Sequence, residues 1–174
     1  AFVGDSTFFA SAITGVVNAV YNQANMVLVV LDNSTTAMTG HQPHPGTGRT
    51  VMGEIVQKIN IEQVLRGIGV TEIETINPLE LEASVSCVKR MAEKSGVRAI
   101  IFKAPCIAVT KPKAPLHVDQ DSCIGCKKCI RDLGCPAIVM NDGKICIDAS
   151  MCTGCHLCSQ VCPVCAIAGG DDHE

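Results

Sequence analysis

Two cysteine-rich runs in the last third of the chain constrain its structure more than any other feature. Each run holds three cysteines with two residues between neighbours, then a spacer, then Cys-Pro: Cys123, Cys126, Cys129 and Cys135 in the first, and Cys152, Cys155, Cys158 and Cys162 in the second. The spacer is five residues long in the first run and three in the second. Three closely spaced thiolates fit three corners of an iron–sulfur cube, and a proline after the fourth cysteine turns the chain away from a continuing helix. The runs therefore predict two 4Fe–4S clusters.

The spacing of the second run is that of two-cluster ferredoxins, in which the fourth cysteine of each run binds the other cluster. We therefore assign Cys123, Cys126, Cys129 and Cys162 to cluster 1, and Cys135, Cys152, Cys155 and Cys158 to cluster 2. The longer first spacer leaves the role of Cys135 open. If the insertion bulges away, Cys146 or Cys165 could replace it, although neither precedes a proline. Zinc or a disulfide framework is the alternative to the clusters, because paired C-x2-C motifs also bind zinc.

The composition of the chain indicates its cellular compartment and excludes some kinds of partner. The chain has 12 cysteines in 174 residues, and no signal peptide is recognisable, so we expect a reducing, cytoplasmic location rather than a disulfide-held secreted protein. No apolar run approaches the roughly 20 residues of a membrane helix. Only one Tyr, four Phe and no Trp occur, without an interleaved basic stripe, so neither a membrane nor a nucleic acid is an expected partner.

A proline-rich linker divides the chain. Pro105, Pro112 and Pro115 disfavour helix and predict an extended connection over residues 104–116. We expect a first domain over residues 1–112 and a second over residues 117–174. The second carries four Lys/Arg against eight Asp/Glu, which suits an electron carrier but also simple solubility. Within it, the turn sequence Asn141-Asp142-Gly143 between two apolar runs predicts a hairpin.

The first domain shows alternating strand and helix signals. We expect strands at residues 2–3, 26–31, 72–76 and 97–102, and helices at 7–21, 61–68 and 79–94, with Asn60 as a cap. The continuous apolar run over residues 26–31 is typical of a buried parallel strand. The predicted fold class is therefore α/β, an open and mostly parallel sheet, followed by a small α+β dicluster ferredoxin-like domain.

Polar motifs follow the first two strands, where ligands of such sheets bind. Gly4-Asp5-Ser6 and Asp32-Asn33-Ser34-Thr35 are separated by 25 residues. The pair resembles the thiamine diphosphate signature, a G-D-G followed some two dozen residues later by Asn, with Ser6 in place of the last glycine. A helix start offers N–H groups to a diphosphate, and oxygen atoms of Asp5 and Asn33 suit Mg²⁺. A lone Gly-Asp-Ser at a strand end is otherwise an ordinary turn and cap.

Two longer stretches, residues 4–22 and 31–46, resemble the family of indolepyruvate ferredoxin oxidoreductase, α subunit. The resemblance implies thiamine diphosphate bound near Gly4, Ser6 and Gly40, and the Thr35 carbonyl as a third Mg²⁺ ligand. It also implies oxidative decarboxylation of an aryl 2-oxo acid to acyl-coenzyme A and CO₂, with electrons passing to external ferredoxin and a second, β subunit as partner. The alternative is a non-catalytic electron-transfer module of a larger redox complex.

Two histidines follow in the same loop. His41 and His44 lie where a neutral imidazole could donate a hydrogen bond to cofactor or substrate, although ordinary loop histidines are the alternative. His41, next to Gly40, has the better case as a catalytic candidate. Strands that should precede Gly4, and a pyrimidine-binding domain with an activating Glu, are not recognisable. We therefore expect residues 1–174 alone to show no turnover.

Overall fold

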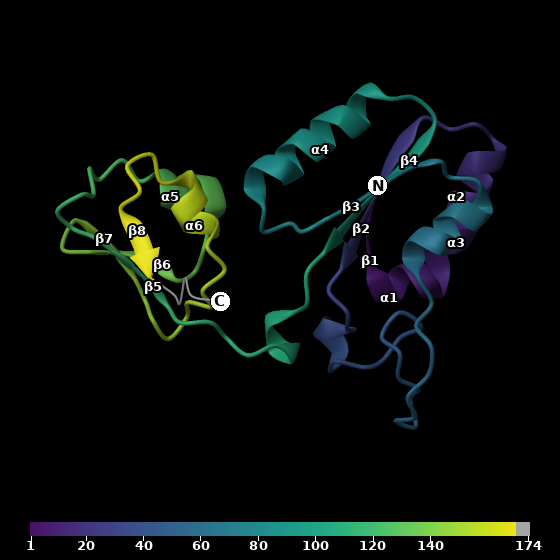
Figure 1. The fold of residues 1–174 in the computed structure, drawn as a ribbon, viewed down its shortest axis with the longest axis horizontal. Helices are drawn as coiled ribbons and strands as arrows, with labels where there is room; N and C mark the ends of the chain where they lie inside the picture. Colours follow the sequence, from purple (N-terminus) through teal and green to yellow (C-terminus); the bar gives the residue numbers. More distant parts are fainter. Residues whose placement is uncertain (170–174) are drawn as a thin grey trace. The chain divides into compact units, whose positions relative to one another are not determined.

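The computed structural model describes residues 1–169 and divides into two compact units, Ala1–Thr110 and the segment that begins at Lys111 (Figure 1). The division falls inside the proline-rich segment over residues 104–116. Among residues 1–169, no helix is both long enough and apolar enough to cross a lipid bilayer.

A four-stranded parallel sheet forms the centre of the first unit, in the order β1-β2-β4-β3. Its strands are β1 (Phe2–Gly4), β2 (Met26–Asp32), β3 (Glu72–Ile76) and β4 (Val97–Lys103). Gly4 pairs with Leu31, so β1 and β2 end side by side. Strand β2 lies between two neighbours and is buried at Leu28, Val29 and Val30, which explains why its apolar run is continuous rather than alternating. The predicted fold class is confirmed.

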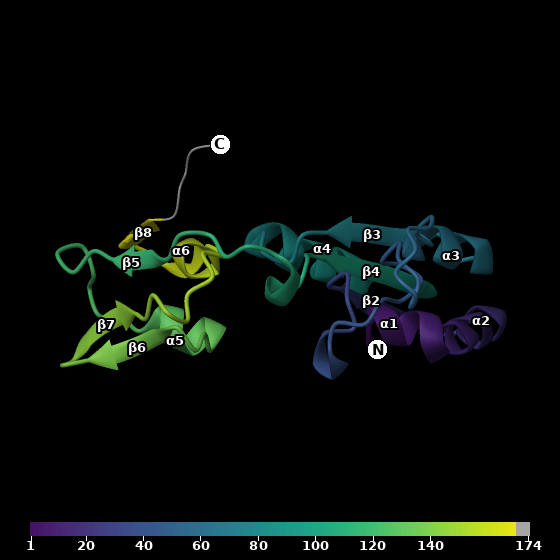
Figure 2. The same cartoon turned by 90° about the horizontal axis from the view of Figure 1, so that it is seen from below.

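Helices cover both faces of this sheet (Figure 2). They are α1 (Asp5–Thr7), the π-helical turn η1 (Phe8–Ala12), α2 (Ile13–Tyr21), α3 (Ile61–Ile68) and α4 (Leu81–Glu93). On one face, Phe8 and Leu65 pack with Val30 of β2 in the main core cluster. On the other face, Cys87 and Met91 of α4 pack against Ile100 of β4. In β4, Ala99 and Ile101 belong to the first cluster and Ile100 to the second, so neighbouring residues of one strand face opposite layers, as the pleat requires.

Local signals explain where two of the helices begin. Asn60 Oδ1 accepts a hydrogen bond from Gln63 N at 3.1 Å, which confirms the predicted cap of α3. Helix α4 begins at Leu81, two residues later than predicted. Asn77 Oδ1 accepts a bond from Leu79 N at 3.0 Å, so the intervening residues form a turn instead of helix.

The second unit is built from two similar halves. The first half comprises β5 (Leu116–Val118), α5 (Lys128–Leu133) and β6 (Ile138–Asn141), and the second comprises β7 (Lys144–Ile147), α6 (Leu157–Val161) and β8 (Ile167–Gly169). Strands β6 and β7 form the hairpin predicted at Asn141-Asp142-Gly143. Strands β5 and β8 pair antiparallel and join the ends of the two halves. Short 3-10 turns at Ala37–Thr39 (η2) and Ile107–Val109 (η3), both in the first unit, are the remaining elements within residues 1–169.

Candidate cofactor and cluster sites

Asp5 ties together the chain segments that follow β1 and β2. It is the first residue of α1 and is only 3% exposed. Its Oδ1 accepts a hydrogen bond from Ser6 N, and its Oδ2 accepts one from Ser34 N, both at 2.8 Å. Because these donors come from two different strand ends, the carboxylate fixes the loop after β2 against the start of the helix.

The loop after β2 gathers the other predicted magnesium ligands. Ser34 adopts a left-handed conformation with φ of 63°, which turns the chain sharply. Asn33 Oδ1 accepts a bond from Thr35 N at 3.2 Å, and Asn33 O accepts one from Cys106 N at 2.9 Å. Thr35 is buried. Asp5, Asn33 and Thr35 therefore share one edge of the sheet, while their binding of Mg²⁺ stays a prediction.

His44 lies directly beside Asp5. Its Nε2 is 3.1 Å from Asp5 Oδ2, and the imidazole stacks on Phe9 with ring centroids 5.8 Å apart. Its Nδ1 accepts a hydrogen bond from Gly46 N at 3.2 Å, so a neutral ring carries its proton on Nε2. That N–H is close to Asp5 but not aligned for a hydrogen bond, and it finds no hydrogen-bond partner among residues 1–169. His44 thus presents a buried donor that an added acceptor would satisfy.

An open pocket lies beside the His44 side chain. It is lined by Ser6, Thr7, Phe9, Ala10, Thr36, Pro43, His44 and Pro45. The pocket lies at the start of the continuous helical segment 5–21 and beside His44, whose unpaired Nε2–H is buried. Both features favour an anion with several oxygen acceptors, such as a diphosphate. A side chain added at Gly4 would meet no described atom within 4 Å, so a ligand can approach the backbone there.

The remaining predicted residues lie further along the same loop. His41 is exposed, has a φ of 61°, and its backbone N donates to Thr36 O at 3.0 Å. Gly40 is exposed and ends the η2 turn with a φ of 117°. Neither contacts Asp5 through any bond that the structure records. Of the two loop histidines, the structure therefore places His44, and not His41, at the carboxylate.

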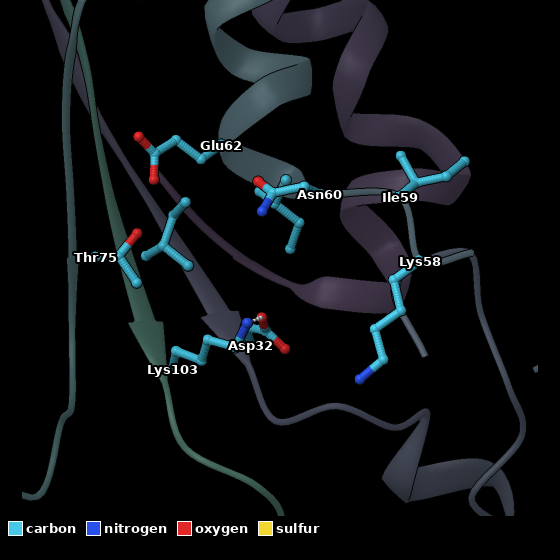
Figure 3. A pocket seen from close by; sticks show the side chains of 10 residues that line it. Asp32, Lys58, Ile59, Asn60, Glu62, Thr75 and Lys103 are labelled. Atoms are coloured by element: carbon cyan, nitrogen blue, oxygen red, sulfur yellow. Dashed lines mark ion pairs between the residues drawn. The ribbon is translucent and has the colours of Figure 1, made fainter. Parts of the chain in front are cut away.

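A second pocket lies at the carboxyl ends of β2, β3 and β4 (Figure 3). Figure 3 shows Lys103 and Asp32 meeting where their strands end; Lys103 Nζ is 3.6 Å from Asp32 Oδ2. Asp32 Oδ1 also accepts from Ser34 N at 3.1 Å. One N–H, that of Ser34, therefore serves both Asp5 and Asp32. The sequence alone marked Asp32 only as part of the motif and gave no signal for this shared donor.

In the second unit, the four cysteines assigned to cluster 1 line one apolar cavity. They are Cys123, Cys126, Cys129 and Cys162, and the same cavity is lined by Ile124, Val164 and other apolar side chains. Burial raises the pKa of the Cys129 thiol, and the neighbouring charges of Cys126 and Cys162 raise it further. Ala166 N donates to Cys162 Sγ at 3.2 Å. N–H donors of this kind help to set the potential of an iron–sulfur cluster.

The cysteines assigned to cluster 2 also lie together. Burial raises the pKa of the Cys158 thiol to about 11, and the charges of Cys155, Cys152 and Cys135 act in the same direction. Cys135 is therefore within electrostatic reach of the second run despite its longer spacer. Cys146 instead lies on β7, where it pairs with Val139 of β6, and Cys165 is exposed.

The two cysteine loops share one backbone conformation. Gly125 and Gly154, before the second cysteine of each run, have φ of 65° and 67°, and the residues after that cysteine, Lys127 and His156, both have φ of 60°. The two extra residues in the spacer of the first run lie after this loop, between Cys129 and Cys135. Helix α5 has 6 residues where α6 has 5, and Gly134 adds a left-handed turn with a φ of 57° before Cys135.

These donor sets differ in kind from a site for a single metal ion. Within residues 1–169, no three His, Cys, Asp or Glu side chains converge on one ion. In a 4Fe–4S cube each thiolate binds its own iron, and the proposed magnesium ligands are a carboxylate, an amide and a carbonyl. The thiolate sets and the donor-lined pocket beside Asp5 fit the clusters and the diphosphate that the sequence predicts.

Comparisons with known proteins give the same division. Residues 1–102 match the family model for the thiamine pyrophosphate enzyme, C-terminal TPP binding domain, and residues 116–163 match that for the 4Fe-4S dicluster domain. Indolepyruvate oxidoreductase subunit IorA of Methanothermobacter thermautotrophicus is 46% identical over 168 residues, covering 95% of this chain and 27% of that protein. The subunit IorA of Archaeoglobus fulgidus is 40% identical over 173 residues, covering 96% of this chain and 28% of that protein. The chain therefore spans about a quarter of the length of these relatives.

Proposed function

This chain belongs to the thiamine pyrophosphate enzymes with a C-terminal TPP binding domain, and on that premise we propose that it is part of a 2-oxoacid:ferredoxin oxidoreductase of the indolepyruvate type. One observation carries the proposal: the chain combines a thiamine pyrophosphate-binding domain with a 4Fe–4S dicluster domain. A bound thiamine cofactor would supply the means to take an electron pair from a 2-oxo acid, and bound clusters would pass on one electron at a time.

In this proposal, residues at the carboxyl edge of the sheet hold the cofactor's diphosphate. Asp5 and Asn33 side chains and the Thr35 carbonyl bind Mg²⁺, whose ligands are oxygen atoms. The start of the helical segment and the unpaired His44 N–H would supply hydrogen-bond donors to the phosphate oxygens. When bound, thiamine diphosphate supplies an electron sink for decarboxylation. Gly4 leaves the backbone accessible, Ser6 lines the pocket, and Gly40 lies in the loop that carries His44.

The eight assigned cysteines hold two 4Fe–4S clusters as the route for electrons. The balanced reaction converts one 2-oxo acid anion, coenzyme A and two oxidised ferredoxins into acyl-coenzyme A, CO₂, two reduced ferredoxins and one proton. We propose an aryl pyruvate such as indolepyruvate as substrate, because the IorA relatives carry that name.

The proposal includes a second subunit and a cytoplasmic location. IorA is named as a subunit in the relatives, which supports a partner chain. The many free cysteines suit a reducing compartment. Residues 1–174 alone are not expected to turn over, since the pyrimidine half of the cofactor needs a further domain.

Calorimetric titration of the complete, anaerobically prepared enzyme with thiamine diphosphate and Mg²⁺ tests the proposal. We expect saturable binding that needs the metal. Asp5→Ala should abolish it while leaving the visible absorbance of the clusters unchanged, because Asp5 and the cysteines lie in different units. Absent cofactor binding in the complete enzyme would overturn the proposal and leave an electron-transfer module without catalysis.

A further inference from the structure

The two cysteine loops have the same backbone path but differ in exposure. In the first loop, Cys123–Arg131, Ile124 is 66% exposed, and Cys126, Lys127 and Lys128 are exposed as well. At the equivalent positions of the second loop, Thr153 and Leu157 are half-buried and Gly154 is buried. The first loop is therefore the side of the domain on which a thiolate and an apolar side chain reach the surface together.

A segment of the same unit accounts for the difference. Lys113 N donates to Thr153 O at 3.3 Å. A Cβ added to Gly154 would lie 2.7 Å from Ala114 O and from Lys113 Cβ. The chain before β5 thus covers the second loop. At Gly125, the equivalent glycine, an added Cβ would meet no described atom within 4 Å.

The exposed loop also concentrates positive charge. Lys127, Lys128 and Arg131 occupy positions that are His156, Leu157 and Gln160 in the second loop. Three of the four Lys/Arg of residues 117–174 therefore lie here, in a domain of acidic balance. Arg131 Nη2 donates to Cys126 O at 3.2 Å, which holds this cation against the loop. Two acidic residues are near in the sequence: Asp121 precedes the loop, and Asp132 lies on α5 four residues after Lys128.

We propose that the first loop is the docking surface for an acidic one-electron carrier protein. This inference rests on the proposed function, which requires such an acceptor. Three cations around an exposed apolar residue match a partner whose contact face is acidic around its own redox centre. Val164, exposed and lining the same cavity as Ile124, extends the apolar centre of the surface. In each encounter the carrier gains one electron that the enzyme loses, and no bond or proton changes hands.

The test compares charge reversals in the complete enzyme with its partner subunit. Lys127→Glu/Lys128→Glu changes the proposed surface, whereas Lys144→Glu reverses the one remaining cation of residues 117–174, which begins β7 at the hairpin turn. The probe is a purified acidic two-cluster ferredoxin, and binding is measured as Kd by biolayer interferometry at low salt. We expect Kd to rise about tenfold or more in the double variant and less than twofold in Lys144→Glu.

Lys128→Glu alone is a second variant, because residue 128 is helical and avoids the left-handed position of Lys127. It should raise Kd about threefold to fivefold. An unchanged Kd in both variants, or an equal rise in Lys144→Glu, would overturn the inference. Reduction of the cationic dye methyl viologen by the 2-oxo acid should be unaffected by all three. If the unaltered enzyme did not reduce the dye, that result would count against the proposed function. The Kd measurements would still show whether the first loop is the docking surface.

Discussion

His44 Nε2 lies 3.1 Å from Asp5 Oδ2, with both side chains almost completely buried. Three contacts fix the imidazole: the Gly46 N–H at Nδ1, the Phe9 ring on one face, and the Asp5 carboxylate. His44 also lines the pocket beside Ser6 and Thr7. We therefore predict that the Nε2–H of His44 donates to an anion bound beside Asp5.

His44→Ala should weaken binding of magnesium thiamine diphosphate by about tenfold, because a buried donor to charged oxygens is lost. His44→Gln should recover most of the affinity, since its amide nitrogen reaches to about the place of Nε2. The measurement is the Kd of the complete enzyme by calorimetry. His41→Ala, in the same loop but exposed, is the matched control and should change Kd less than twofold. Equal losses for the two histidines would contradict this assignment.

Gly46→Ala should disturb the same site through packing alone. An added Cβ would lie 2.9 Å from Phe9 Cε2 and 3.0 Å from His44 Cε1, so one of the rings must move. We expect a loss of about 1–3 kcal/mol in unfolding free energy and a severalfold weaker cofactor affinity. Gly15→Ala on α2 is the control, because its Cβ would meet no described atom within 4 Å and alanine favours helix by up to about 1 kcal/mol. Denaturant unfolding of both variants checks the difference.

The sequence could mark the loop of residues 40–46 but could not rank its histidines. His41 follows a glycine, which suggests a turn near a ligand, and this favoured it over His44. The structure places His41 in a left-handed, exposed position, whereas Pro43 and Pro45 flank the histidine that reaches Asp5. Which of the two histidines lies beside Asp5 depends on which side chain the folded loop turns inward. His44 is held there by stacking on Phe9, which is distant in the sequence.

Cys135→Ala should remove one of the two clusters. Iron and acid-labile sulfide should fall from about eight to about four of each per chain, because one cube lacks its fourth thiolate. Cys146→Ala is the matched control and should keep about eight of each, since Cys146 lies on the hairpin strand β7. Iron loss in Cys146→Ala with retention in Cys135→Ala would reverse the assignment.

Gly154→Ala and Gly125→Ala should differ in effect although both glycines are left-handed, with φ of 67° and 65°. Both substitutions carry the same backbone strain of about 1 kcal/mol. Only the Cβ at position 154 would collide with Lys113 and Ala114. We expect Gly154→Ala to lose its cluster absorbance in air at least several times faster than Gly125→Ala. Similar rates would show that the covering segment does not protect the second loop.

The fold was largely predictable from the sequence because its strongest signals are local. The apolar run of β2, the Asn60 cap and the turn at Asn141-Asp142-Gly143 each fix an element without help from distant residues. Strands β5 and β8 escaped prediction. Each has three residues, and they are defined by pairing with each other across about fifty residues of intervening chain. The π-helical turn at Phe8–Ala12 also carries no composition signal of its own.

The extra helical residue of α5 and the left-handed Gly134 bear on how such domains are recognised in genomes. A two-residue insertion between Cys129 and Cys135 is taken up by the helix end and the glycine turn, and the thiol still reaches the other half. A search pattern that demands a fixed three-residue gap would therefore miss the first run of this chain. A pattern that permits the longer gap when glycine immediately precedes Cys-Pro would detect it.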